Sequence, residues 1–190
     1  MHFCFMFHVS CSILNMHLII ALGNPGQQYE NTRHNAGFLV LDELQKSLGF
    51  SQFEKNSKFD ALICEKNLDG EKIILAKPQS FMNRSGEVVR KIMDFYKIPK
   101  ENLLVLHDDL DINIGAFKIS TDSSAAGHNG VQSVIDNLGS QQFKRIRIGI
   151  EGSEKKKDRI IPGEVFVLQD FSVEELGAIK KLAEEIEKEI

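Results

Sequence analysis

The chain has 190 residues, of which 42% are hydrophobic and 26% are charged, a composition typical of one folded globular domain. Lys and Arg number 23 against 27 Asp and Glu, so the net charge is −4. This balance excludes a uniformly basic protein that coats nucleic acid, but it allows a local basic face. The three cysteines share no metal-ligand or disulfide spacing, which favours the cytoplasm.

The first fifteen residues form an apolar and aromatic stretch without Lys or Arg. They lack the positive segment and the cleavage site of a signal peptide. Joined to residues 17–22 they approach membrane-spanning length, but Asn15 and His17 interrupt the run, so a membrane anchor is disfavoured. Met16 offers a second start. We expect residues 1–15 to be a dispensable extension, or an artefact of start-site choice, and residues 16–190 to form a single domain.

The first predicted element is a buried strand at 18–22, which ends at Gly23-Asn24-Pro25-Gly26 because proline cannot continue a central ladder. Apolar residues then recur at helical spacing from Phe38 to Leu48, so a helix is predicted from about residue 35. The beginning of this helix lies beside His34. Segments 59–65 and 72–76 flank Asp69-Gly70, a pair that favours an antiparallel hairpin.

The second half of the chain continues the alternation of strands and helices. A helix is predicted at 84–97 and a strand at 103–106, which runs into the polar sequence His107-Asp108-Asp109-Leu110-Asp111. A strand at 116–119, a polar loop at 120–127, a helix near 128–138 and a strand at 143–150 follow. Ser172 and Glu175 form a capping box that opens a final helix. These elements indicate an α/β fold with a mixed sheet and sites at strand ends.

Five short polar segments follow apolar elements and carry residue types suited to hydrolysis. They are Gly23-Asn24-Pro25-Gly26, Thr32-Arg33-His34-Asn35-Ala36-Gly37, Phe81-Met82-Asn83-Arg84-Ser85-Gly86, His107-Asp108-Asp109-Leu110-Asp111 and Gly127-His128-Asn129-Gly130. A histidine such as His34 can act as a general base, and Asp108 could fix its tautomer by accepting the imidazole N–H. Taken singly, His34 is typical of a surface or capping residue and Asp108 of a turn.

The remaining polar residues favour activated water over a covalent intermediate. Asn24, Asn83 and Asn129 supply neutral donors and acceptors for an amide-bearing substrate and a developing oxyanion, although each alone is typical of a turn or cap. Ser85 and Cys64 lack the sequence context of a nucleophile elbow. The six histidines form no HExxH or paired Cys/His pattern, so we expect no metal.

Basic residues gather near the last predicted strand. Arg145 and Arg147 alternate onto one of its faces with Lys118 close to them, and lysines 155–157 and Arg159 follow in a loop. These cations either bind phosphates of a nucleic acid or form a solvated charged face.

Together and in this order, the five polar segments resemble those of the bacterial peptidyl-tRNA hydrolase family, and the similarity runs from Met16 to the final helix. The resemblance implies a monomeric α/β domain in which helices surround one mixed, twisted sheet. It also implies hydrolysis, without a cofactor, of the ester that joins a peptide to the terminal ribose of tRNA. This reaction recycles tRNA from prematurely released peptidyl-tRNA.

The same resemblance suggests roles for the site residues. It implies that His34 is the catalytic base, that Asp108 orients it, and that Tyr29 lines the cleft. The three asparagines position substrate and water: we expect Asn83 near the attacked carbonyl or water, Asn24 near the terminal ribose and Asn129 on the peptide backbone.

A second group of residues is expected to contact parts of the substrate away from the ester bond. Phe81 and Met82 could pack against the terminal base or the first peptide side chain, or could belong to the core. Lys118, Arg145 and Arg147 are expected to meet tRNA phosphates.

Two segments depart from the family pattern. Ala125-Ala126 stands where the family commonly has glycines, and Glu151-Gly152-Ser153 with the lysine run replaces a loop similar to Gly-His-Pro-Gly. Substrate contacts there are the least secure part of the resemblance.

Two other functions compete with ester hydrolysis. A non-catalytic RNA-binding protein on this scaffold is disfavoured because both His34 and Asp108 are present. A small-molecule amidase is disfavoured because a nucleophile elbow and metal ligands are lacking. We therefore expect a cytoplasmic, monomeric enzyme whose partner is peptidyl-tRNA, with no membrane and no metal.

Overall fold

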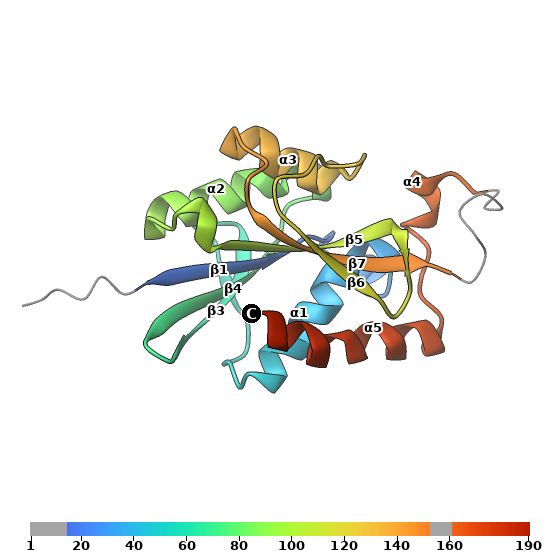
Figure 1. Cartoon of the computed structure of the whole chain (residues 1–190), viewed down its shortest axis with the longest axis horizontal. Helices are drawn as coiled ribbons and strands as arrows, with labels where there is room; N and C mark the ends of the chain where they lie inside the picture. The colour runs from blue at the N-terminus through green and yellow to red at the C-terminus, as the bar shows by residue number, and fades with distance from the viewer. Residues whose placement is uncertain (1–14, 153–160) are drawn as a thin grey trace, which may run out of the picture.

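The computed structural model of the chain describes residues 15–152 and 161–190 (Figure 1). Residues 1–14 of the expected extension lie outside the described residues, as do lysines 155–157 and Arg159 of the basic loop. Within the described ranges, no helix is both long and apolar enough to cross a membrane.

A seven-stranded mixed sheet forms the centre of the molecule, in the order β2-β3-β4-β1-β5-β7-β6. Its strands are β1 (Met16–Ala21), β2 (Glu54–Asn56), β3 (Ala61–Leu68), β4 (Glu71–Pro78), β5 (Leu103–Asn113), β6 (Phe117–Ser120) and β7 (Lys144–Glu151). The four middle strands are parallel, while β2, β3 and β6 run antiparallel to their neighbours. The predicted mixed sheet and the hairpin at Asp69-Gly70 are confirmed; both turn residues have positive φ, 49° and 88°.

Helices cover both faces of the sheet. The pair α1 (Ala36–Ser47) and α5 (Val173–Ile186) packs on one face, and α2 (Ser85–Tyr96) and α3 (Asn129–Leu138) pack on the other, with α4 (Gly163–Phe166) at one end (Figure 1). Short 3₁₀ helices are η1 (Gln27–Tyr29), η2 (Arg33–Asn35), η3 (Met82–Arg84), η4 (Lys100–Asn102) and η6 (Glu187–Glu189). The predicted capping box of α5 is confirmed.

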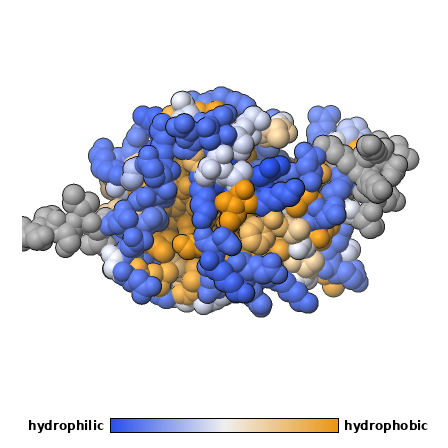
Figure 2. Space-filling model, viewed as in Figure 1, coloured by the Kyte–Doolittle hydropathy of each residue, from blue (hydrophilic) through white to orange (hydrophobic). Residues whose placement is uncertain are grey.

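The apolar pattern of the strands explains this layering. Residues 18–22 are all buried, so β1 has apolar side chains on both faces and needs a helical layer on each side. Two buried clusters result, one with α2 and α3 and one with α1 and α5. Hydrophilic residues cover the outer surfaces of the two layers, and hydrophobic ones show mainly in the band between them (Figure 2).

The prediction that the strand ends at residue 106 was wrong. β5 continues to Asn113, and His107, Asp108 and Asp109 still pair with β7 before the register shifts. The polar sequence was expected to follow the end of the strand, but these three residues are buried and belong to the strand itself. Polar groups of the site therefore project from a strand within the sheet.

Candidate active site

The polar segments meet at the carboxyl end of β1 and beside the middle of β5. Gly37 lets α1 begin directly against these strands, because a Cβ there would lie 2.8 Å from the Leu106 carbonyl oxygen and 2.9 Å from that of Leu22. This close approach brings η2, which carries His34, to the middle of β5. A cleft of about 360 Å³ opens there, and His34, Asp108 and Asn129 are among its lining residues.

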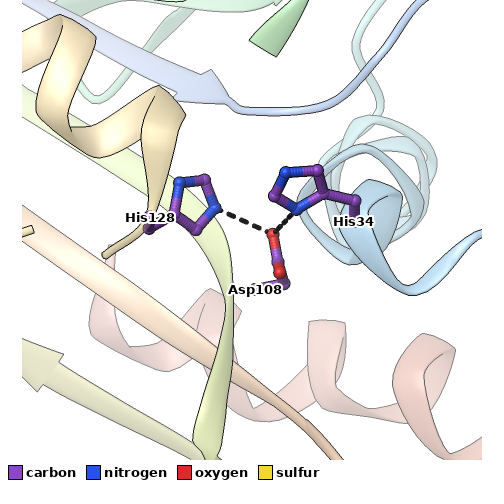
Figure 3. A group of neighbouring side chains, drawn as sticks. All are labelled: His34, Asp108 and His128. Atoms are coloured by element: carbon purple, nitrogen blue, oxygen red, sulfur yellow. Dashed lines mark hydrogen bonds and ion pairs between the residues drawn. The ribbon is translucent and has the colours of Figure 1, made fainter. Parts of the chain in front are cut away.

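His34 and Asp108, which are 74 positions apart, form a hydrogen-bonded pair (Figure 3). The His34 Nδ1 lies 2.9 Å from Asp108 Oδ1, and the His34 backbone N–H donates to the Val167 carbonyl at 2.8 Å. An ionised carboxylate only accepts hydrogen bonds, so Nδ1 carries the proton and Nε2 keeps its lone pair. His34 therefore has the tautomer that a general base requires.

The charge of Asp108 favours the protonated form of His34. Burial opposes the charged imidazole, but the charge and hydrogen bond of Asp108 outweigh it and raise the pKa of His34 above 6.5. Burial would likewise raise the pKa of Asp108, yet the neighbouring imidazoles of His34 and His128, with their hydrogen bonds, hold it well below its ordinary value. Asp108, which is 2% exposed, is thus a stable anionic partner.

His128 completes the cluster, and the sequence analysis gave it no role. Its Nε2 lies 2.9 Å from the same Asp108 Oδ1, while its Nδ1 accepts the N–H groups of Gly130 and Val131 at the start of α3 (Figure 3). Because Nδ1 acts as an acceptor, the ring proton lies on Nε2 and is donated to Asp108. The sequence signal was the position of His128 at the start of the helix predicted near 128–138, but histidine is not among the preferred N-cap residues.

Donor chemistry argues against a metal ion at His34, Asp108 and His128. One ligand atom from each lies within 4.8 Å of the others, a spacing that a metal could use. A metal-binding histidine, however, normally donates its second ring N–H to an acceptor. The Nδ1 of His128 instead faces two backbone donors, which leaves no place for that proton.

His107 is a further buried histidine beside the cluster. Its Nδ1 lies 2.7 Å from the Asp108 carbonyl oxygen, and its ring packs edge-on against His128. Burial, followed by the effect of His128, lowers the pKa of His107 to about 3. His107 is therefore neutral, and its ring packs against that of His128.

Asn24 is held in place by a reciprocal contact with Asn35, which the sequence analysis did not single out. The Asn24 backbone N–H donates to Asn35 Oδ1 at 2.8 Å, and Asn35 Nδ2 donates to the Asn24 carbonyl at 3.0 Å. The Asn24 Oδ1 accepts the backbone N–H of Met82 at 3.0 Å. With its oxygen engaged, the Asn24 side chain offers its Nδ2 donors to a ligand.

The other expected substrate residues lie around these elements. Met82 is buried against the start of α3, since a Cβ at Gly130 would lie 2.4 Å from its sulfur. Phe81 is 60% exposed, and Asn83 and Asn129 are also exposed. Tyr29 is partly buried in η1. Met82 thus belongs to the core, which is one of the two alternatives predicted for it. Phe81, Asn83 and Asn129 are accessible to a substrate.

The three expected tRNA-binding cations have different surroundings. Arg145 is 1% exposed and donates to the carbonyl groups of Ser123 and Ser124, so its guanidinium is not available to a phosphate. This burial corrects the expectation for Arg145. Arg147 is partly exposed and pairs with Asp109 at 2.7 Å, and Lys118 lies opposite Arg147 on β6 and is exposed.

Comparisons with known proteins agree on one family. A family model described as peptidyl-tRNA hydrolase matches residues 18–190. The peptidyl-tRNA hydrolase of Listeria welshimeri is 46% identical over 178 residues, which cover 90% of this chain and 92% of the relative. That of Thermoanaerobacter sp. strain X514 is 51% identical over 140 residues, covering 74% and 75%. A crystal structure of peptidyl-tRNA hydrolase from Acinetobacter baumannii matches with a TM-score of 0.79 at 33% identity, covering 90% and 84%.

Proposed function

This chain belongs to the peptidyl-tRNA hydrolase family, and we propose how its residues hydrolyse the ester between peptide and tRNA. His34 Nε2 removes a proton from water, and the resulting hydroxide attacks the ester carbonyl carbon. The tetrahedral intermediate then collapses as the imidazolium of His34 returns its proton to the departing ribose oxygen. The products are deacylated tRNA and a free peptide whose carboxylic acid loses its proton to solvent and becomes a carboxylate.

Asp108 makes His34 effective in both steps. By accepting the Nδ1–H it directs the lone pair of Nε2 toward the cleft, and its charge stabilises the imidazolium that forms during attack. The raised pKa of His34 makes it a stronger base for water, and it remains largely neutral at pH values above that pKa. His128 keeps the carboxylate ionised and fixed by donating a second N–H to the same oxygen.

The asparagines are assigned to the substrate around this pair. We assign Asn83 to the attacked carbonyl or the water, where an amide N–H can stabilise the oxyanion. Asn24 is assigned to the terminal ribose, since its Nδ2 is free of the contact that fixes Oδ1. Asn129, the first residue of α3 and part of the cleft wall, is assigned to the peptide backbone. Tyr29 and Phe81 border the same substrate.

We assign the tRNA phosphates to Lys118 and Arg147. Lys118 is exposed and Arg147 is partly exposed on the neighbouring strand, and contacts from cations to phosphates give affinity that does not depend on sequence, as an enzyme that accepts many tRNAs requires. We also propose that the protein acts as a cytoplasmic monomer without a metal, and that residues 16–190 form its domain. The family match beginning at residue 18 supports this boundary.

The observation that carries the mechanism is the arrangement of His34, Asp108 and His128 on one carboxylate oxygen. A single-turnover reaction in H₂¹⁸O with an N-blocked aminoacyl-tRNA tests it. The label is expected in the released carboxylate, and His34→Ala is expected to abolish its appearance. An unblocked aminoacyl-tRNA serves as the comparison substrate. Wild-type cleavage that leaves the label out of the acyl product would contradict water attack at the carbonyl.

A further inference from the structure

Arg145 lies beneath the loop that carries His128 and leads directly into Asn129. We call residues 121–128 the β6–α3 loop, since they join the end of β6 to the start of α3. Ser120, the last residue of β6, pairs with Arg145 on β7, so the chain leaves the sheet next to this arginine. The Arg145 side chain is 1% exposed, and its guanidinium lies 5.4 Å from the centre of the Phe143 ring.

The guanidinium of Arg145 binds two successive residues of this loop. Its Nη1 donates to the Ser124 carbonyl at 3.0 Å, and its Nη2 donates to the carbonyl and the hydroxyl of Ser123. Ser123 is partly buried and Ser124 is exposed, and the planar guanidinium fork bonds to both of their carbonyl groups at once. A lysine ammonium has the same charge but cannot reproduce the fork.

The loop beyond these serines has a backbone conformation that needs support. Ala126 has φ of 49° and Gly127 has φ of 85°. For alanine, the left-handed region costs about 1–2 kcal/mol. Such a conformation persists where the surrounding structure fixes it. Ala125, which is 6% exposed and packs into the core, and the bonds from Arg145 supply that support.

The position of the loop determines the position of His128. The His128 backbone N–H donates to the Ala125 carbonyl at 2.9 Å, and the His128 side chain then reaches both Asp108 and the start of α3. Asn129 follows directly and lines the cleft. Hydrogen bonds and short backbone segments thus connect Arg145 to the second donor on Asp108 and to one proposed substrate contact.

We propose that Arg145 is a positioning residue for ester hydrolysis, which holds the β6–α3 loop so that His128 and Asn129 face Asp108 and the substrate. This inference rests on the proposed function and extends it. It replaces the expectation that Arg145 contacts tRNA, and it predicts that shape rather than charge is what the reaction requires at this position.

Arg145→Lys tests the proposal because it keeps the charge and removes the fork. Turnover of saturating peptidyl-tRNA is expected to fall about 10- to 100-fold, the loss typical of a site displaced by about 1 Å. The dissociation constant for deacylated tRNA and its salt dependence are expected to stay as in the wild type. Arg90→Lys, an exposed arginine of α2, is the matched control and should leave turnover unchanged.

Arg145→Gln and His34→Ala separate the possible outcomes. A phosphate contact predicts the opposite pattern: normal turnover and affinity for Arg145→Lys, and weakened tRNA binding with a shallower salt slope for Arg145→Gln. That pattern, or wild-type turnover of Arg145→Lys, would overturn the proposal. If the Gln variant does not fold, the Lys variant alone decides. Turnover of His34→Ala close to that of the wild type would instead refute the proposed mechanism, whatever Arg145 does.

Discussion

Replacing His128 with asparagine separates its two hydrogen-bonding roles. In the native protein, Nδ1 caps α3 and Nε2 donates to Asp108. Asparagine is a strongly preferred N-cap residue, so His128→Asn should preserve the cap. Its side chain has no atom at the place of Nε2, so the bond to Asp108 is lost. His128→Ala is the companion variant, since it removes both contacts.

The expected effect on pH dependence follows from the shared oxygen of Asp108. A hydrogen bond to a charged group contributes about 1.5–3 kcal/mol. When His128 no longer donates, Asp108 stabilises the protonated form of His34 more strongly, so the pKa of His34 rises further. If the bond between Asp108 and protonated His34 gains between half and all of about 1.5 kcal/mol, the pKa of His34 rises by about 0.5–1 unit, since one pKa unit corresponds to about 1.36 kcal/mol.

The assay is kcat/KM for peptidyl-tRNA hydrolysis as a function of pH. Neutral His34 is the active base, so activity rises with pH through its pKa, and the acid limb of His128→Asn should move to higher pH. The ratio of wild-type to variant activity should therefore be largest on the acid side of both pKa values and should shrink in alkali. His128→Ala should also unfold at a temperature lower by about 2–4 °C, since an N-cap contributes about 1 kcal/mol. An acid limb of His128→Asn that coincides with the wild type would refute the shared-oxygen argument.

Three other substitutions test separate parts of the structure. Asp108→Asn can donate to Nδ1 of His34 and so favours the wrong tautomer; turnover should fall by about 10²–10⁴-fold while the melting temperature stays near the wild type, and a rate within a few-fold would count against Asp108. Arg147→Gln should weaken tRNA binding and make the slope of log K against log salt concentration shallower by about 1, as measured by salt titration. Unchanged affinity would show that Arg147 does not contact tRNA. Ala126→Gly should relieve the left-handed backbone and stabilise the protein by about 1 kcal/mol in urea denaturation, whereas destabilisation would show that its φ of 49° is not a strained conformation.

Much of the fold could be predicted from local patterns. The buried strand at β1, the helix after His34, the Asp-Gly hairpin and the capping box of α5 depend on residues close in sequence, and the structure confirms each of them. The length of β5 could not be predicted in this way. Its polar half stays in the sheet because distant elements supply partners for His107, Asp108 and Asp109.

In the site, too, some features could be predicted from local sequence and others depend on residues that are distant in the chain. The pairing of His34 with Asp108 could be proposed from residue chemistry and resemblance, and the structure brings the two together. The roles of His128 and Asn35 could not, because each depends on a hydrogen bond to a residue that only the fold places nearby. Arg145 was misjudged for the same reason: alternation along a strand shows which face a cation occupies, but not which loop covers that face.

The pH dependence of hydrolysis by His34→Ala, compared with the wild type, is the most direct test of the mechanism. In the wild type, kcat/KM should show an acid limb above pH 6.5, because Asp108 raises the pKa of His34. In the variant, the rate should fall by about 10²–10⁴-fold and that limb should disappear, with folding preserved. A variant that retains both the rate and the acid limb would show that another group activates the water.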